Sequence, residues 1–511
     1  RIMLEIIQFQ VTPEQAKDSG FLKVKIQKEL KLKSDNFAFK WKRRSIDARN
    51  RNIKINCTFS VYFEGEKAEA PHLFVSNGEL KGEMAIVGFG PAGIFAALRS
   101  LEKGIKPIIF ERGKDVRSRR RDLALLHKES VVNPESNYCF GEGGAGTYSD
   151  GKLYTRSKKK GDVMRTLEWF VQFGASADIL VDAHPHIGTN KLPQIIVAMR
   201  EAIIANGGEV HFESKVTDFF SENGKITGLE INNDKTHNFE RVILATGHSA
   251  RDIIELLDKK KWQLNAKPFA LGVRVEHPQN LIDKIQYHGR LNDEFVPPAS
   301  YSLVSQVNGR GVYSFCMCPG GIIAPCATAD GEVVTNGWSP SKRNNPFANS
   351  GIVVSISPND FEDKSAFACL NFQREVEQKC WEVAGKNQKV PAQRLIDFIE
   401  GVKSVDLPKS SYQPGLTSVD LNEILPDIIS QNLKEAFKDF GQKMNGFLTN
   451  DAVLHAPESR TSSPVQIPRD ETMQHPDVRG LYPCAEGAGY AGGIVSAAID
   501  GMRCVDAMDY D

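Results

Sequence analysis

The sequence predicts an α/β protein built on a parallel sheet, with a mixed α+β segment inserted into it and a small α+β module before it. Three observations support this prediction. A strand, a glycine turn, a helix and a second strand follow one another in residues 84–112. A strand, a glycine turn and a helix recur at 480–501. Between them, residues 265–440 contain several runs that alternate as antiparallel strands do.

Residues 84–112 carry the most informative motif. The apolar run 85–87 is typical of a buried parallel strand, and the turn Gly88-Phe-Gly90-Pro91-Ala92-Gly93 follows it. In such a turn the first glycine permits the bend, the second lets the backbone approach a pyrophosphate, and the third lets the helix pack closely. The helix start would face the phosphates with its positive end. A second strand ends on Glu111, roughly 20 residues after Gly90, where a carboxylate accepts hydrogen bonds from ribose hydroxyls. The motif predicts a Rossmann-like dinucleotide-binding unit; the alternative is a glycine-rich strand-to-helix turn without a ligand.

The length of 511 residues predicts roughly three domains, one of them formed by two separate parts of the chain. The expected boundaries follow the motifs: 1–80, an N-terminal basic module; 81–264, the first part of the nucleotide-binding domain; 265–440, an inserted substrate or cap domain; 441–511, the second part of the nucleotide-binding domain.

Composition and charge exclude several classes of protein. The chain is 41% hydrophobic and 25% charged, with 64 basic and 64 acidic residues, so no global charge recruits nucleic acid or membrane. No apolar run reaches the roughly 18–20 residues of a membrane helix, and residues 1–6 lack a signal-peptide pattern. The nine cysteines are scattered, without paired CxxC spacing. We therefore expect a cytoplasmic protein with reduced thiols and no metal site.

The N-terminal module is expected to contain strands at 4–9, 37–45 and 53–63, with a helix at 13–30 that is broken near Gly20. It is locally basic, with few acids. The basic residues are Lys23, Lys25, Lys28, Lys31, Lys33, Lys40, Lys42, Arg43, Arg44, Arg49, Arg51 and Lys54. Two interpretations are open: a solvated face balanced by acids elsewhere, or a docking face for RNA or an acidic protein partner.

The rest of the nucleotide-binding domain alternates between helices and strands. A glycine cluster at 140–153 cannot form a regular helix or strand, so it either wraps a flat ring or a phosphate or is a mobile surface loop. A buried strand at 242–244 ends in another small-residue turn, Thr246-Gly247. The remaining elements are expected at these ranges: helices at 116–128, 162–173 and 192–206; strands at 209–219 and 225–232.

The inserted segment is expected to pair antiparallel strands with helices on one side. The strands are predicted at 269–276, 301–307, 311–317 and 332–336, and the helices at 366–384, 392–400 and 433–440. Cys316 and Cys318 lie two residues apart, and such residues share one face of a strand. They are either a redox thiol pair near the active site or two small buried side chains.

A resemblance becomes clear once these stretches are compared together. The motifs VGFGPAG with Glu111, ATG at 245–247 and LYPCAEGAGYAGGI look like the FAD signatures of glutathione-reductase-like flavoproteins with an inserted substrate domain. GEGGAGTYSDGKL, HIGTNKL, FCMCPGG and ESRTSSP resemble more closely the family described as uncharacterised FAD-dependent dehydrogenases. The resemblance implies FAD as cofactor, held by the following residues: Gly88, Gly90, Pro91, Ala92, Gly93, Glu111, Arg112, Gly143, Gly144, Val216, Thr246, Gly247, Glu486, Gly487, Gly493 and Ile494.

The expected function is that of an FAD-dependent oxidoreductase, a dehydrogenase that moves a hydride between a small organic substrate and flavin N5. Only one full dinucleotide fingerprint is present, so NAD(P)H is expected at most as a transient electron donor. The candidate catalytic residues lie in stretches that match the family: Lys152, His186, Cys316, Cys318 and Arg460. An arginine could clamp a substrate carboxylate, and a histidine could act as general acid or base. The alternative is an FAD-containing RNA- or protein-binding factor that docks through its basic module.

Overall fold

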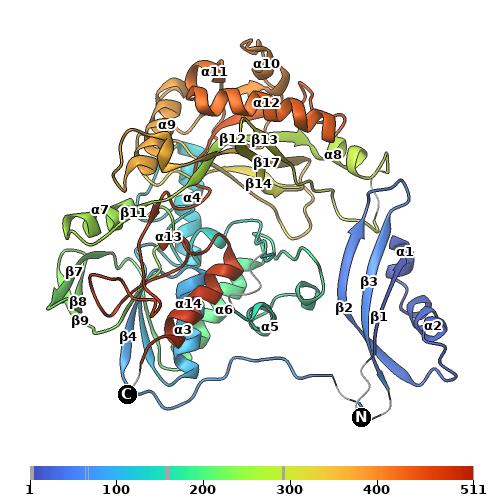
Figure 1. Ribbon diagram of the computed structural model, residues 1–511, viewed down its shortest axis with the longest axis horizontal. Coiled ribbons are helices and arrows are strands. Elements are labelled where there is room, and N and C mark those ends of the chain that lie inside the picture. The colour runs from blue at the N-terminus through green and yellow to red at the C-terminus, as the bar shows by residue number, and fades with distance from the viewer. Residues whose placement is uncertain (1–4, 64, 67, 156–160, 291–293, 510–511) are drawn as a thin grey trace.

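The computed structural model describes residues 5–63, 65–66, 68–155, 161–290 and 294–509. It contains three layered parts (Figure 1). A parallel sheet with helices lies at the lower left of that view, an antiparallel sheet covered by helices lies above it, and a small module stands to the right. Within the described ranges, no helix combines the length and the apolarity that a membrane span needs.

The parallel sheet has five strands in the order β22-β10-β4-β5-β6. Its strands are β4 (Glu83–Val87), β5 (Lys106–Phe110), β6 (Glu209–His211), β10 (Val242–Leu244) and β22 (Leu481–Pro483). All four pairings are parallel, so the carboxyl ends of the strands meet at one edge. Strands from both ends of the chain therefore complete one sheet.

Two kinds of cover bury this sheet. On one face lie α3 (Pro91–Glu102) and α14 (Ile494–Asp506), which run side by side in Figure 1. The two helices can pack closely because Gly501 has no side chain; a Cβ there would overlap the Ala92 carbonyl oxygen. On the other face, Phe219 and Leu229 pack against the sheet. The remaining elements of this part are α4 (Val116–Glu129), α5 (Val163–Gln172), α6 (Leu192–Ala205), β7 (Val216–Glu222), β8 (Lys225–Ile231), β9 (Lys235–Asn238) and α7 (Arg251–Lys259).

The second part is a seven-stranded sheet in the order β13-β14-β17-β12-β20-β18-β19. Its strands are β12 (Phe269–Pro278), β13 (Val304–Val307), β14 (Arg310–Cys318), β17 (Phe347–Ile356), β18 (Val390–Arg394), β19 (Leu416–Ser418) and β20 (Val453–Glu458). Its helices are α8 (Gln279–Gln286), α9 (Ala368–Ala384), α10 (Leu395–Glu400), α11 (Leu421–Ile424) and α12 (Asp427–Lys443). Two small ladders are separate from this sheet: β15 (Ile322–Pro325) pairs with β16 (Thr335–Trp338), and β11 (Asn265–Ala266) pairs with β21 (Val465–Gln466), whose Val465 packs in the core of the first part.

The structure differs from the expected elements in this second part. The helix expected at 392–400 begins only at Leu395, because Ala392 and Arg394 pair with His455 and Val453 of β20. This β20 strand lies beyond residue 440, where the return to the nucleotide-binding domain was expected, yet it pairs with β12 and β18. In the first part, the single strand expected at 209–219 is two strands that belong to different sheets.

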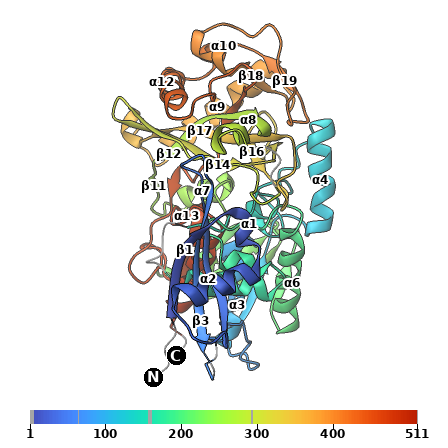
Figure 2. The same cartoon turned by 90° about the vertical axis from the view of Figure 1, so that its right-hand side faces the viewer.

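The N-terminal module comprises β1 (Glu5–Val11), α1 (Pro13–Ala16), α2 (Ser19–Glu29), β2 (Phe37–Asp47) and β3 (Lys54–Phe63), with antiparallel strand order β1-β3-β2. Leu4, the first residue of an expected strand, lies outside the described residues. Figure 2, viewed from this side, shows the module in front of the parallel-sheet part. The contact is specific: Arg44 Nε donates to Asp182 Oδ1 at 2.8 Å, and the backbone of Arg44 pairs with Val181 and Ala183.

Candidate functional site

One cavity of about 320 Å³ lies at the carboxyl edge of the parallel sheet. In open α/β sheets this edge is where ligands bind. The turns that follow β4, β5, β10 and β22 contribute to its walls, and residues of β14 and β16 in the second part close one end. Among the residues expected to hold the cofactor, those that line the cavity are Gly88, Gly90, Pro91, Ala92, Glu111, Arg112, Gly144, Val216, Thr246, Gly247, Glu486, Gly493 and Ile494.

Three expected cofactor residues stand behind the cavity wall. A side chain at Gly93 would overlap the Gly88 carbonyl oxygen, and one at Gly143 would overlap the Thr147 hydroxyl. A Cβ at Gly487 would lie 2.6 Å from the Gly247 oxygen. These glycines therefore bring the turns together rather than lining the space between them.

Glu111 is a buried acceptor at the end of β5. Its Oε2 accepts from Phe89 N at 2.9 Å, and its Oε1 accepts from Gly113 N at 2.9 Å and Gly141 N at 3.1 Å. Burial raises the pKa of Glu111, and the three N–H donors partly oppose that rise. A carboxylate has about four acceptor sites, so about one remains for a ribose hydroxyl.

The start of α14 borders open space. A Cβ at Gly492 would meet nothing within 4 Å, and one at Gly493 only the Ser496 Oγ at 3.9 Å. The Gly493 N–H, expected to face the cofactor, donates instead to Ser496 Oγ at 3.1 Å. The backbone N–H groups available to a ligand at this end are therefore those of the first turn of α14, because the first N–H groups of a helix have no partner within the helix.

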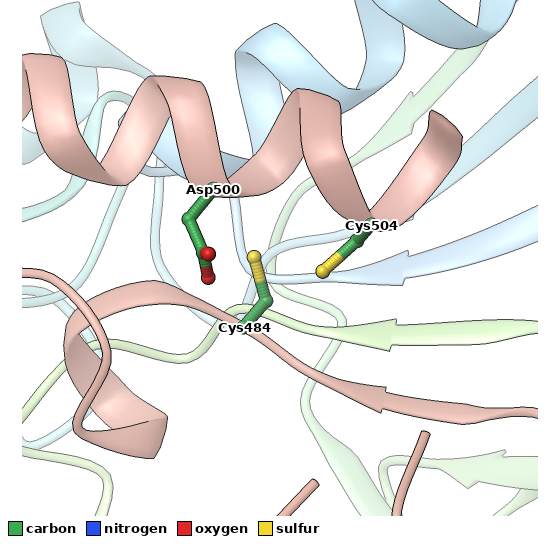
Figure 3. A group of neighbouring side chains, drawn as sticks. All are labelled: Cys484, Asp500 and Cys504. Carbon is green, nitrogen blue, oxygen red and sulfur yellow. The ribbon is translucent and has the colours of Figure 1, made fainter. Parts of the chain in front are cut away.

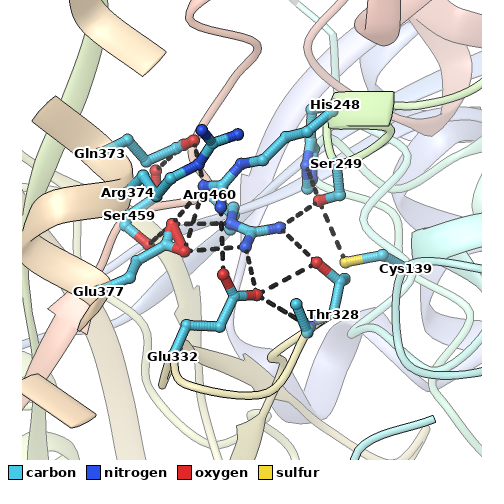
Figure 4. Close-up of polar contacts among 12 residues, drawn as sticks. Cys139, His248, Ser249, Thr328, Glu332, Gln373, Arg374, Glu377, Ser459 and Arg460 are labelled. Atoms are coloured by element: carbon cyan, nitrogen blue, oxygen red, sulfur yellow. Dashed lines mark hydrogen bonds and ion pairs between the residues drawn. The ribbon is translucent and has the colours of Figure 1, made fainter. Parts of the chain in front are cut away.

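Arg460 lies in an ion network between the two sheets (Figure 4). Its Nε donates to Glu377 Oε1 at 2.9 Å, and its NH2 donates to Glu377 Oε2 at 2.8 Å and Glu332 Oε1 at 2.9 Å. Its NH1 donates to Ser249 and Thr328 hydroxyls. An arginine has five N–H donors, and all five are used. The expected role as a substrate clamp is therefore corrected: Arg460 borders the cavity but joins the two parts of the molecule.

The end of the cavity beside β14 carries charge. Lys152 Nζ lies 2.6 Å from Asp150 Oδ2 and 3.7 Å from Cys318 Sγ, and Lys152, Asp150 and Cys318 all line the cavity. Burial would lower the pKa of Lys152, but Cys318 and Asp150 outweigh it, so the pKa is raised. Burial opposes ionisation of Asp150, yet Lys152 and Arg343 hold its pKa well below its usual range. Both groups are charged at neutral pH.

Cys316 and Cys318 do not share a strand face. The pairing of β14 with β17 shifts between Phe315 and Cys318, and Cys316 has a left-handed φ of 47°. Such backbone is rare outside glycine and is stabilised here by Arg274, whose NH1 donates to the Cys316 oxygen at 3.1 Å. Cys318 is buried, whereas Cys316 is exposed toward the cavity. The groups around the cavity nevertheless desolvate the Cys316 sulfur and raise the pKa of its thiol to about 12, so the thiol is protonated at neutral pH.

His186 lies outside the residues that line the cavity. Its Nε2 faces the Ser341 carbonyl oxygen at 3.2 Å, and its backbone forms a bridge with Lys152. Burial lowers the pKa of His186 to about 4, so the ring is neutral at neutral pH. Its position favours support of the Lys152 segment over contact with a substrate.

Sequence comparisons identify the family. A family model described as "FAD-dependent protein, C-terminal domain-like" matches residues 268–461, and "Domain of unknown function (DUF8436)" matches residues 3–62. A protein of Clostridium beijerinckii, named "Uncharacterized protein", is 40% identical over 511 residues and covers 96% of each chain. The chain belongs to this family of FAD-dependent proteins.

Solved structures that resemble this FAD-dependent protein have low scores. Tetracycline destructase Tet(51) has a TM-score of 0.35 at 10% identity, over 83% of this chain and 80% of that chain. CtdE in complex with FAD has a TM-score of 0.30 at 10% identity, over 82% and 81%. L-proline dehydrogenase from P. horikoshii has a TM-score of 0.34 at 13% identity, over 84% and 93%.

The cavity of the FAD-dependent protein fits an extended dinucleotide. Bare backbone borders it at Gly90, Gly247 and Gly492, so two flat ring systems and a pyrophosphate can approach the chain closely. Glu111 offers an acceptor near one end of the cavity, and α14 offers a helix start at another place along it. FAD is the cofactor of this protein.

Sequence reasoning missed Arg119, which organises the second glycine cluster. Arg119 is fully buried, and its guanidinium donates to four backbone carbonyls, those of Asn137, Tyr138, Glu142 and Gly144. In the sequence, Arg119 is one of several arginines in the helix expected at 116–128, and nothing distinguishes it from the others. The periodicity of the helix does not indicate the role of Arg119, because the carbonyl groups that accept its hydrogen bonds lie on a loop.

One further group of side chains lies beside the cavity, and one of its members, Cys484, lines it. Within the described ranges, Cys484, Asp500 and Cys504 are the three side chains whose spacing suits metal ligands (Figure 3). Asp500 is already engaged, because Arg469 donates to both its oxygens at 2.8 Å and Ala485 N donates at 2.7 Å. A hydrogen bond to Cys504, together with burial, raises the pKa of Cys484 well above its usual value. The Arg469 guanidinium thus takes the place at the Asp500 carboxylate that a metal ion would need. Through Ala485, Asp500 also fixes the turn that leads to Glu486.

Proposed function

We propose that the protein is an FAD-dependent dehydrogenase that transfers a hydride between a small organic substrate and flavin N5. The observation that carries the proposal is the composition of the cavity wall. Bare backbone turns border most of it, whereas Lys152, Asp150 and the thiol of Cys316 border the end near β14. A cofactor needs bare backbone that it can approach closely, and a reacting substrate needs polar side chains near the reacting atoms.

The cofactor contacts in this proposal follow the resemblance. The pyrophosphate would lie against Gly88–Gly93, the adenosine ribose at Glu111 beside Arg112, and the adenine at the backbone of Val216. The flavin would lie between the Gly143–Gly144 turn and the start of α14. Thr246, Gly247 and Glu486 would border the part of the cofactor between these two ends, with Gly487 holding the turns together behind them. The shared cavity supports this arrangement.

FAD, when bound, supplies the hydride acceptor or donor. The protein's part is to bind, orient and adjust charge. The first turn of α14 would stabilise negative charge on the flavin by its dipole. Lys152 would hold an ammonium group near the reacting atoms, and Asp150 would keep that ammonium in place. Phe315 and Gly337 would exclude water from this end.

The finer parts of the proposal concern architecture and electron flow. We infer a glutathione-reductase-like arrangement, with the antiparallel sheet as a substrate domain inserted between the two parts of the FAD-binding domain. Transient NAD(P)H is the proposed electron donor where the organic substrate is not one. A reducing cytoplasm suits nine free cysteines.

An anaerobic spectral titration tests the function. The purified holoprotein is titrated with NADH, NADPH and candidate organic acids and amines while the flavin absorbance is recorded. Bleaching with a 1:1 end point, followed by return of the colour with an electron acceptor, is expected. A holoprotein whose flavin is bleached by dithionite but by no organic donor would contradict the proposal.

The alternative function is an FAD-containing RNA- or protein-binding factor. Strand β2 supports it, because Lys40, Lys42 and Arg43 are exposed there. Arg44 is unsuited to its test because it pairs with Asp178 and Asp182 across the module's contact. The variant Lys40→Gln/Lys42→Gln/Arg43→Gln should abolish a salt-dependent RNA shift if this function holds, with Lys434→Gln as the control.

A further inference from the structure

The charged end of the FAD cavity contains a carboxylate with an unused oxygen. Asp150 is 3% exposed and lines the cavity. Its Oδ2 contacts two cations, Lys152 Nζ at 2.6 Å and Arg343 NH2 at 2.9 Å. Its Oδ1 is buried, and no donor among the described residues reaches it. A buried carboxylate oxygen without a donor is costly, and this points to a donor supplied from outside the chain.

The same place also offers a cation. The Lys152 side chain is 37% exposed and borders the cavity, so its ammonium reaches the space as well as Asp150. With Arg343 behind it, the cluster holds two cations and one anion. His186, the neighbouring titratable group, is held neutral by burial, which lowers its pKa to about 4. The cluster therefore carries a net positive charge that favours an anionic group.

The cluster of Asp150, Lys152 and Arg343 lies at the end of the cavity where the substrate is proposed to bind. Gly146 lies against Ile494 at the start of α14, where a Cβ would meet the Ile494 side chain at 3.2 Å. Six residues further on, Lys152 reaches Cys318 of β14 at 3.7 Å. The cluster thus lies between the proposed flavin end and the antiparallel sheet.

We propose that Asp150 and Lys152 form a binding site for α-amino or α-hydroxy carboxylates. The substrate carboxylate pairs with the Lys152 ammonium, and its amino or hydroxyl group donates to Asp150, whose buried Oδ1 turns toward the cavity to accept it. Arg343 is a positioning residue that keeps Asp150 oriented. This inference rests on the proposed function in one respect: the ligand is the substrate class of that same cavity.

Calorimetric titration of the oxidised, anaerobic holoprotein tests this site. The probes are alanine and lactate, each in both enantiomers, and propionate, which has the carboxylate without the second group. We expect alanine or lactate to bind more tightly than propionate. Lys152→Met should weaken all probes by about 10- to 100-fold, the loss of one charge-assisted contact.

Asp150→Asn separates the two halves of the site. It should weaken alanine or lactate by about 10-fold or more while leaving propionate unchanged or tighter, because an anion is removed from beside the cation. Lys191→Met is the control, since this exposed lysine before α6 does not line the cavity, and it should bind every probe as the wild type does.

Two outcomes would overturn the site. One is binding of alanine and lactate that is no tighter than that of propionate in the wild type; the other is unchanged affinity in Lys152→Met. Failure of the proposed function is separate, because it appears as a flavin that no organic donor bleaches, whatever the calorimetry shows. Melting temperatures of the holoprotein variants check that each remains folded.

Discussion

Gly90 and Gly144 touch through their backbones. A Cβ at Gly144 would lie 3.0 Å from the Gly90 Cα, so the turn after β4 and the second glycine cluster form one continuous wall. The contact brings together two segments that are far apart in the sequence, and both line the FAD cavity. The width of the cavity at this point depends on the absence of side chains at both positions.

Gly144→Ala should reduce FAD occupancy. Gly144 has a φ of +65°, and its added methyl would press against backbone rather than against a flexible side chain. Gly289→Ala is the control, with a φ of +92° but nothing within 4 Å. Both variants should lose about 1–2 kcal/mol of unfolding free energy from backbone strain. Only Gly144→Ala should lose FAD, measured as flavin per protein; equal occupancy would contradict this explanation.

Gly493→Val should shift the flavin midpoint potential. Gly493 is extended, with a φ of −166°, and an added Cβ would meet only Ser496 Oγ at 3.9 Å, so the apoprotein should fold. The new side chain would separate the flavin from the α14 dipole. Loss of about 0.3–1 kcal/mol corresponds to about 10–20 mV toward more negative potential. An unchanged potential at full FAD occupancy would show that the helix start does not act on the flavin.

Arg460→Met should strongly destabilise the protein. Among the described residues, the change leaves Arg251 as the remaining ion-pair partner of the buried Glu332 and Glu377, and breaking a buried pair costs about 3–5 kcal/mol. Arg374→Met is the control, because its pair with Glu255 is partly exposed and should contribute less than about 1 kcal/mol. Denaturant unfolding of both apoprotein variants measures the difference. Similar losses would mean that the network does not act as a buried lock.

The same network predicts an acid dependence of stability. Burial opposes ionisation of Glu377, but Arg251 and Arg460 lower its pKa to about 2. A lowered carboxyl pKa stabilises the fold above the unfolded pKa of roughly 4.3, and this contribution is lost as the pH falls toward 2. Arg460→Met should therefore show a smaller decline in stability over that range. An identical pH profile in wild type and variant would exclude Arg460 as the cause.

Arg119→Met should release the second glycine cluster. Four backbone carbonyls would lose their buried donor, at about 1–3 kcal/mol for each left unsatisfied, so the loss should exceed about 3 kcal/mol. Arg121→Met, on the exposed side of the same helix, should change stability by less than about 0.5 kcal/mol. FAD occupancy should fall only in Arg119→Met. Retained occupancy would indicate that the cofactor itself orders the loop.

Glu486→Gln should change the stability of the apoprotein more at pH 8 than at pH 5. Burial raises the pKa of Glu486 to about 7, although Lys267 opposes that rise. A raised carboxyl pKa means that the folded state binds more protons, so stability is lost as the pH rises from about 4.3 through 7. The glutamine variant lacks this loss. A difference in unfolding free energy between variant and wild type that does not change with pH would contradict a raised pKa of Glu486.

Most of the glycine turns that line the cavity were predictable, because glycine turns after buried strands have local causes. Gly88 needs a φ of +103°, and glycine is the residue that adopts it without strain. The helix expected at 392–400 failed for a non-local reason: Ala392–Arg394 pairs with β20, about 60 residues further along the chain, and pairing overrides local preference. The assignment of Arg460 as a clamp failed because its donors are taken by side chains of three separate segments, at residues 249, 328–332 and 377.

The sequence by itself determined where the backbone is bare and where buried strands end, and so located the turns that line the cavity. Those features depend on a residue and its immediate neighbours. Only the tertiary structure decided which charged side chains remain available to a substrate. All five N–H donors of Arg460 and four of those of Arg119 are taken by partners elsewhere in the chain, whereas Lys152 and Asp150 line the cavity and one Asp150 oxygen has no donor among the described residues. Availability depends on every group that packs nearby, and packing joins residues that no local pattern connects.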